Sequence, residues 1–217
     1  MKILLVDDHA VVRQGYAALL RVLLPEAEVI EACDGEQALT KALESPPSLV
    51  IMDIGLPGIS GLEATRRLRQ RLPQLRIMFF SMHDELPLVR QALDAGAIGY
   101  ITKSSSPEVL VDAVRRTLVG HAYIEQPLAI QLARNPATAS DQDARLQGMT
   151  QREFEIFVML AKGTPARLID ERLCISGKTV SNYLTMLKSK LQVSSHAELV
   201  HLAIDTGLLR VGDRVVG

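Results

Sequence analysis

Cysteine is scarce in this chain of 217 residues: Cys33 and Cys174 are the only two, and they lie far apart with no Cys-x-x-Cys spacing. This predicts neither a disulfide framework nor a zinc site, so we expect both thiols to be reduced and buried. The histidines are also scattered, which predicts surface or helix-capping positions for most of them rather than metal ligation; they are His9, His83, His121, His196 and His201.

Long apolar runs and an excess of positive charge are missing as well. No apolar stretch reaches the roughly 18 to 20 residues of a membrane span, and Lys2 followed by Asp7 does not fit a cleavable signal peptide. The formal net charge is −1, so any contact with nucleic acid requires a local basic patch. The hydrophobic content of 47% suffices for one or two packed domains, and we expect a cytoplasmic protein without membrane association.

Short apolar runs alternate with helical patterns in the first half of the chain. The runs lie at 2–6, 27–31, 48–52, 76–80 and 98–101. Between the first two, Val12, Tyr16, Leu19 and Leu23 recur at the spacing of an amphipathic helix. This alternation predicts an α/β fold, a doubly wound five-stranded parallel sheet with helices on both faces.

Polar residues that can carry chemistry follow four of these runs. Asp7 and Asp8 follow the first run, Asp53 the third, Ser81 the fourth and Lys103 the fifth. Because ligands bind at the carboxyl ends of parallel strands, we expect these side chains to converge on one crevice. Crowded carboxylates need a cation or a proton, and oxygen ligands suit Mg²⁺. The pattern indicates phosphoryl chemistry on a carboxylate; the alternative is that each aspartate only caps a helix.

The second half of the chain has a different organisation. Residues 123–147 are polar and contain proline, which predicts an interdomain linker after a first domain at 1–122. Thr150 and Glu153 have the spacing of a capping box and open an apolar-periodic helix. We therefore predict a small all-helical domain over 148–217.

The strand-end residues resemble the receiver domain of two-component response regulators over roughly 1–120, and Ser81-Met82-His83-Asp84 with Lys103-Ser104 resembles the NarL/FixJ branch. The resemblance implies a flavodoxin-like fold with Asp53 as phosphoacceptor. It also implies that Asp7, Asp8, Asp53 and the backbone carbonyl of Gly55 hold Mg²⁺, that Ser81 and Lys103 bind the phosphoryl group, and that Tyr100 is the aromatic switch residue that reorients with Ser81.

The residues Thr150-Gln151-Arg152-Glu153, Ile175–Val180 and Lys190–Val193 resemble the LuxR-type helix-turn-helix over about 149–209. The resemblance implies that a helix capped by Ser176 enters the major groove of DNA. Base edges are then expected to be read by Asn182, Ser181 and Thr185, and phosphates to be bound by Lys178, Lys188 and Lys190, with Thr179 in the same interface. No acidic residue lies between Cys174 and Ala197, which favours a DNA-facing helix.

One segment of this second half departs from the family pattern. Pro165-Ala166-Arg167-Leu168 stands where Ser-Asn-Lys-Glu is common, and Tyr183 and His196 replace the usual His and Arg. The helix that precedes the recognition helix has therefore lost polar groups that relatives carry. Weaker DNA binding, or an unusual target site, is the expected consequence.

Both resemblances together predict a transcription regulator and not an enzyme. A sensor histidine kinase is expected to phosphorylate Asp53, and the protein is expected to bind double-stranded promoter DNA as a homodimer that pairs through the helix near 194–206. One alternative is a receiver whose diverged helical domain acts through protein contact or binds DNA without phosphorylation. Another alternative is a phosphohydrolase of haloacid dehalogenase type. That family expects Asp-x-Asp after the first strand, and the segment Asp7-Asp8-His9-Ala10 of this chain does not match it.

Overall fold

The computed structural model describes residues 1–135, 146, 149–173, 175–206 and 208–209. The chain divides into two compact units, Met1–Pro136 and Ala137–Gly217, and each is described by itself. None of the helices in the described ranges is both long and apolar enough to cross a membrane.

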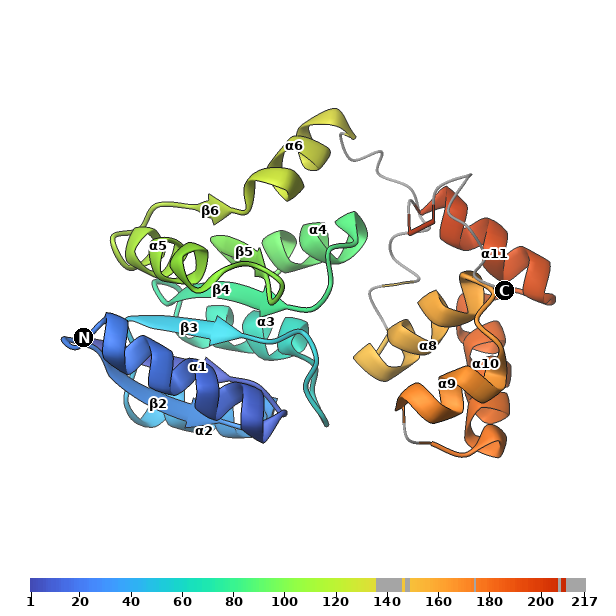
Figure 1. Ribbon diagram of the computed structural model, residues 1–217, viewed down its shortest axis with the longest axis horizontal. Helices are drawn as coiled ribbons and strands as arrows, with labels where there is room; N and C mark the ends of the chain where they lie inside the picture. The colour runs from blue at the N-terminus through green and yellow to red at the C-terminus, as the bar shows by residue number, and fades with distance from the viewer. Residues whose placement is uncertain (136–145, 147–148, 174, 207, 210–217) are drawn as a thin grey trace. The chain divides into compact units, whose positions relative to one another are not determined.

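The first unit is an α/β unit built on a parallel sheet, as the alternating pattern predicted (Figure 1). Its strands lie in the order β2-β1-β3-β4-β5-β6, with β1 at Lys2–Val6, β2 at Glu28–Ala32, β3 at Leu49–Met52, β4 at Arg76–Ser81, β5 at Gly99–Thr102 and β6 at Tyr123–Ile124. Its helices are α1 (Ala10–Leu23), α2 (Gly35–Glu44), α3 (Gly61–Arg71), α4 (Leu86–Asp94), α5 (Pro107–Leu118) and α6 (Gln126–Arg134).

Helices cover both faces of this sheet, and the core lies between them and the strands. α1 contacts α5 on one face, whereas α2 contacts α3 on the other. Every residue of β3 is buried, because a strand covered on both sides has no solvent face. The carboxyl ends of the strands consequently meet at one edge, where the polar strand-end residues lie.

The sheet has a sixth strand where the apolar runs predicted five. β6 pairs with β5 in parallel, Gly99 opposite Tyr123 and Tyr100 opposite Ile124. Two residues are too few to produce a recognisable period, so this strand has no sequence signature. α6 follows directly and contacts α4, with Leu128 buried. Residues 123–134 of the predicted linker thus belong to the first unit, while 136–145 and 147–148 lie outside the described residues.

The cysteines differ from expectation in one case. Cys33 was predicted to be buried but is half-buried, because it lies in the turn after β2, where Gln37 Nε2 approaches its Sγ at 2.7 Å. Cys174 lies outside the described residues.

Gly61 lets the first turn of α3 approach the end of β3 very closely. A Cβ atom at this position would lie 1.9 Å from the carbonyl oxygen of Asp53. Gly61→Ala is therefore expected to lower the free energy of unfolding by about 2 kcal/mol, because backbone must shift to accept the methyl group. Urea unfolding followed by circular dichroism measures this.

Gly15 provides the matched control, since it is exposed in α1 and a Cβ there meets no atom within 4 Å. Gly15→Ala should stabilise the protein by roughly 0.5 to 1 kcal/mol through helix propensity. Equal effects of the two alanine substitutions would contradict the close approach at Gly61.

The second unit is helical over its described residues, as predicted. Its helices are α8 (Gln151–Ala161), α9 (Ala166–Leu173), α10 (Gly177–Leu191) and α11 (His196–Asp205). Thr150 and Glu153 form the predicted capping box of α8, and Ser176 and Ser195 cap α10 and α11. α8 contacts α9, α10 and α11, and Phe157, Leu187 and Leu199 in its core are fully buried.

Candidate functional site

Three aspartates form an acidic cluster at the carboxyl edge of the sheet. The carboxylates of Asp7, Asp8 and Asp53 and the imidazole of His9 each place one ligand atom within 4.8 Å of the others. Asp7 and Asp53 are only 2% and 5% exposed. Their backbone N–H groups prolong the sheet ladder, Asp7 to the carbonyl of Ala32 and Asp53 to that of Val6. The structure thus brings the predicted carboxylates together.

Lys103 forms ion pairs with the two buried members of this cluster. Its Nζ lies 2.7 Å from Asp7 Oδ2 and 2.5 Å from Asp53 Oδ2, and its side chain is 6% exposed. Burial lowers the pKa of Lys103, but the charge of Asp53 and the hydrogen bonds to both carboxylates outweigh it, so the pKa is raised above its ordinary value. The ammonium therefore stays charged and bridges the two acids.

Asp8 is the more accessible carboxylate of the cluster. Burial raises its pKa, the negative charges of Asp53 and Asp7 add to this, and the nearby His9 opposes it. His9 Nδ1 lies 2.8 Å from Asp8 Oδ1, so His9 belongs to the site although we expected no ligand role from the histidines. Its position directly after two aspartates was the only local signal.

The donor set fits Mg²⁺, because the three carboxylates supply the hard oxygen ligands that this ion prefers. Lys103 pairs with only two of the carboxylates, so a net negative charge is left for a cation to balance. Gly55 lies in the buried turn after Asp53. The participation of its carbonyl stays a prediction.

Ser81 and Tyr100 are linked through the backbone of His83. Ser81 is fully buried, and its Oγ accepts a hydrogen bond from the His83 N–H at 3.3 Å. The Tyr100 hydroxyl donates to the His83 carbonyl at 2.8 Å, with the ring fully buried against Phe79. Burial, then the charge of Glu85, raises the pKa of Tyr100 well above its ordinary value, so the phenol keeps its proton. A displacement of Ser81 can therefore affect Tyr100 through the backbone of His83, to which both side chains are hydrogen-bonded.

Arg13 is a member of the site that the sequence analysis did not identify. Its Nη1 donates to the Asp7 carbonyl at 2.6 Å, and its Nε lies 3.4 Å from Glu31 Oε2. These contacts hold the turn between β1 and α1 that carries Asp7 and Asp8. A helical arginine has no local sequence signal that reveals such a contact.

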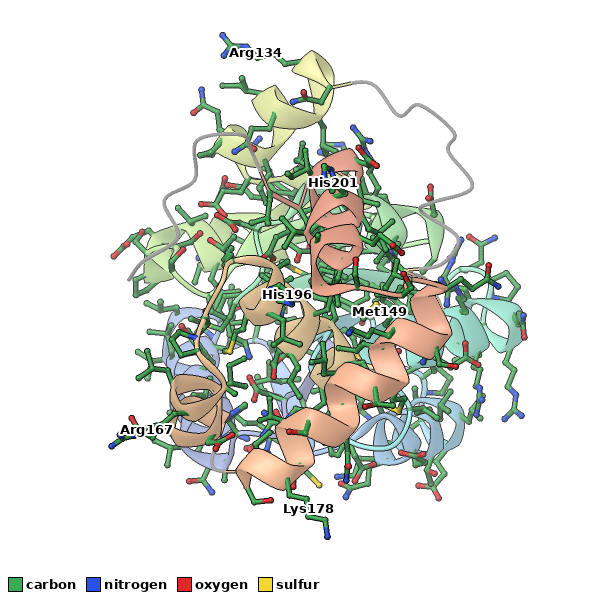
Figure 2. The ribbon with its side chains drawn as sticks, turned by 90° about the vertical axis from the view of Figure 1, so that its right-hand side faces the viewer. Arg134, Met149, Arg167, Lys178, His196 and His201 are labelled. Atoms are coloured by element: carbon green, nitrogen blue, oxygen red, sulfur yellow. The ribbon has the colours of Figure 1, made fainter. Side chains whose placement is uncertain are left out.

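One face of α10 carries most of the residues predicted to contact DNA. Lys178, Ser181, Asn182 and Thr185 are exposed at helical spacing, while Val180, Leu187 and Leu191 are buried on the other side. Lys178 projects from the first turn of the helix (Figure 2). Thr179 is half-buried, with its Oγ1 2.8 Å from Ser176 Oγ, and Lys188 is half-buried.

The hydroxyl groups on this face already use their protons. Ser181 Oγ donates to the Gly177 carbonyl at 3.0 Å and Thr185 Oγ1 donates to the Ser181 carbonyl at 3.1 Å. Their lone pairs are what they offer to a partner. Asn182 is exposed beside them and brings both a donor and an acceptor.

Lys190 makes a contact within the helical unit that the sequence did not predict, and its role toward phosphate stays a prediction. Its Nζ lies 2.6 Å from Glu153 Oε2, and the same oxygen accepts the Thr150 N–H at 2.6 Å. In this structure the ammonium therefore pairs with Glu153, while the lysine itself is exposed. Lys190 joins the last turn of α10 to the start of α8, a pairing over 37 residues that no local pattern reveals.

The acids, the hydroxyl and the lysine at the strand ends of a parallel sheet define the first unit as a receiver domain. The exposed, lysine-bearing helix of the second unit defines a helix-turn-helix domain. Residues 3–115 match the response regulator receiver domain family. Residues 147–203 match the luxR family of bacterial regulatory proteins. The chain belongs to the response regulators of two-component systems that carry a LuxR-type DNA-binding domain, the NarL/FixJ type, as the motifs predicted.

Relatives match over nearly the whole chain. It is 66% identical over 212 residues to the transcriptional activator protein ExaE of Pseudomonas putida, covering 97% of this chain and 99% of that protein. It is 36% identical to the response regulator UvrY of Escherichia coli, covering 96% of this chain and 95% of that protein. The protein is accordingly a DNA-binding response regulator, in a family of transcription regulators rather than enzymes.

Solved structures agree on the fold. A LuxR-family response regulator from Aurantimonas sp. is 41% identical with a TM-score of 0.59, covering 61% of this chain and 95% of that one. The response regulator ChrA of a heme-sensing system is 28% identical with a TM-score of 0.51, covering 96% of this chain and 98% of that one. The RcsB–DNA complex, at 21% identity, 93% and 96% coverage and a TM-score of 0.58, supports the fold alone.

Proposed function

We propose that Asp53 is the phosphoacceptor of this regulator and that its phosphorylation controls binding to promoter DNA. The observation that carries the proposal is the ion pair of Lys103 with both Asp53 and Asp7, which presents a buried carboxylate beside a fixed positive charge. The Asp53 oxygen attacks the phosphorus of a phosphohistidine on a sensor kinase. An O–P bond forms, the N–P bond breaks, and the imidazole leaves.

Lys103 offsets part of the charge of the transferred group. Asp7, Asp8, Asp53 and the carbonyl of Gly55 would hold Mg²⁺, which supplies charge neutralisation on the phosphoryl oxygens when bound. After the transfer, the Lys103 ammonium lies between Asp7 and the phosphoryl group. Arg13 keeps the turn with Asp7 and Asp8 in place, because its Nη1 is hydrogen-bonded to the Asp7 carbonyl.

The added phosphate acts on Ser81 and Tyr100. Phosphorylation brings about two negative charges, and the Ser81 hydroxyl turns to donate to them. This weakens its bond with the His83 N–H, and Tyr100, bonded to the carbonyl of the same residue, repositions. We propose that this rearrangement makes the exposed face of α10 available to double-stranded DNA.

The active form is proposed to be a homodimer that pairs through α11. Leu199, Leu202 and Ala203 of this helix are buried in the core of the helical unit. The pairing surface therefore uses the exposed residues of α11, among them His196 and His201 (Figure 2).

The test combines phosphorylation with mapping of bound DNA. The wild-type protein is expected to take up phosphate from acetyl phosphate and Mg²⁺ and to gain promoter occupancy across the genome, whereas Asp53→Asn does neither. Asp112→Asn serves as matched control and should behave as wild type, because this half-exposed aspartate of α5 pairs only locally, with Arg116 on the same helix, in the described part of the chain. A phosphodonor response retained by Asp53→Asn would refute the phosphoswitch.

A second mode has one observation in its favour. Pro165, Ala166 and Leu168 are exposed where relatives carry polar groups, which suits a helical domain that acts through protein contact or binds DNA without phosphorylation. In that case Asp53→Asn keeps the full set of occupied sites, or no site is occupied by either protein.

A further inference from the structure

Glu125, at the junction of β6 and α6, holds the end of β5 by its backbone and its side chain. Its N–H donates to the Tyr100 carbonyl at 3.0 Å. Its Oε2 accepts two hydrogen bonds from Thr102, one from the N–H at 3.0 Å and one from Oγ1 at 2.9 Å. The carboxylate thus adds two hydrogen bonds to β5 beyond those of the backbone ladder.

Thr102 connects these hydrogen bonds to the phosphoacceptor site. It is 6% exposed, lies opposite Ser81 in the sheet, and directly precedes Lys103. The Lys103 N–H donates to the Ser81 carbonyl at 2.7 Å. Any movement of the Lys103 backbone therefore strains the two bonds between Thr102 and Glu125.

The turn after Thr102 is organised around the same carboxylate. The Thr102 hydroxyl has one proton, and because that proton goes to Glu125, its lone pairs accept from Ser104 Oγ at 2.8 Å and Ser105 Oγ at 3.2 Å. A negative charge at Glu125 thus fixes the direction of each bond in the turn. Ser104, directly after Lys103, takes part in this network through its hydroxyl group.

Glu125 also begins α6, the last described helix of the first unit before the connection to the second. It is the N-cap residue of α6, which packs against α4 with Leu128 buried. The carboxylate therefore connects the lysine turn with the helix that leads out of the receiver.

We propose that Glu125 is a positioning residue for phosphoryl transfer, which fixes the turn that carries Lys103 and passes the displacement of that turn to α6. The proposal rests on the proposed function of Asp53. When Asp53 gains a phosphoryl group, the Lys103 ammonium follows the new charge. The backbone of Thr102 moves with it, and the bonds to Glu125 transmit this movement to the first turn of α6.

The test uses two variants of the full-length protein. Glu125→Gln keeps the shape and an acceptor oxygen but removes the charge, and Thr102→Val removes the hydroxyl bond from the strand side. Glu108→Gln is the matched control, since this exposed glutamate of α5 bonds locally to Ser106. Phosphoryl uptake from acetyl phosphate with Mg²⁺ is measured at saturating donor, and hydrogen exchange of 126–134 is measured before and after phosphorylation.

Glu125→Gln and Thr102→Val are expected to take up phosphate about fivefold to tenfold more slowly than Glu108→Gln, because a charge-assisted hydrogen bond no longer fixes the turn. Phosphorylation should change exchange in α6 of the wild type and of Glu108→Gln, and leave it unchanged in the two variants. Wild-type exchange in β1 and β3 of the variants verifies their fold.

The failures are distinguishable. If the wild type takes up no phosphate, the proposed function itself is wrong. If the wild type is phosphorylated and both variants match Glu108→Gln in rate and in α6 exchange, the role of Glu125 is overturned. Slow uptake with a normal α6 response overturns the transmission to α6.

Discussion

Replacing Lys103 by methionine is expected to lower the free energy of unfolding by about 3 to 5 kcal/mol in Mg²⁺-free buffer. Its ammonium lies 2.7 Å from Asp7 and 2.5 Å from Asp53, which are 2% and 5% exposed. Without it, two like charges remain buried at one edge of the sheet. One of them must then take up a proton or the site must open to water.

Three comparisons make this prediction specific to the ion pair. Lys41→Met in α2 should have a much smaller effect, since Lys41 Nζ donates to the backbone carbonyl of Glu31 rather than to a buried acid. The double variant Lys103→Met, Asp53→Asn should recover part of the lost stability, because only one buried charge remains. Added Mg²⁺ should stabilise Lys103→Met more than the wild type.

The same substitution is expected to slow phosphoryl uptake at least about 100-fold, as removal of a fixed charge-stabilising donor does in other active sites. Urea unfolding and uptake from acetyl phosphate are the two measurements. A Lys103→Met protein as stable as Lys41→Met would show that the pair contributes nothing to the fold, and normal uptake would remove Lys103 from the proposed mechanism.

The acidic site was predictable because its logic is that of the sheet itself. Each of Asp7, Asp53, Ser81 and Lys103 ends an apolar run, and parallel strands bring their carboxyl ends to one edge whatever the lengths of the connections. Local patterns were sufficient in the second unit too, where the Thr150 and Glu153 capping box and the Ser176 cap formed as expected.

What escaped prediction is pairing between distant residues. β6 is too short to show a hydrophobic period. The carboxylate of Glu125, which follows β6, bonds to Thr102, a residue 23 positions away in the sequence. Arg13 looks like an ordinary surface cation in the sequence, yet it supports the Asp7 turn. Lys190 looks like a phosphate contact, yet it pairs with Glu153. Such contacts are set by tertiary packing, which spacing along the chain does not encode.

Replacing Glu153 by alanine is expected to lower the stability of the helical unit by about 3 kcal/mol. Its side chain is 7% exposed, and Oε2 accepts both the Thr150 N–H and the Lys190 ammonium. The substitution removes half of the capping box of α8 and leaves Lys190 without its partner at the end of α10. Hydrogen exchange of α8 and α10 in the full chain measures the loss, with Glu155→Ala on the same helix as control.

The two lysines of α10 should then separate by their response to salt. Lys178→Gln, at the exposed start of the helix, is expected to reduce the slope of log affinity for DNA against log salt by about 0.9, the value for one lost phosphate contact. Lys190→Gln should leave that slope unchanged and instead speed hydrogen exchange in α10, because its charge is engaged with Glu153. A reduced slope for Lys190→Gln with normal exchange would place Lys190 on the phosphate backbone, as the sequence suggested, and would show that the pair with Glu153 opens when DNA binds.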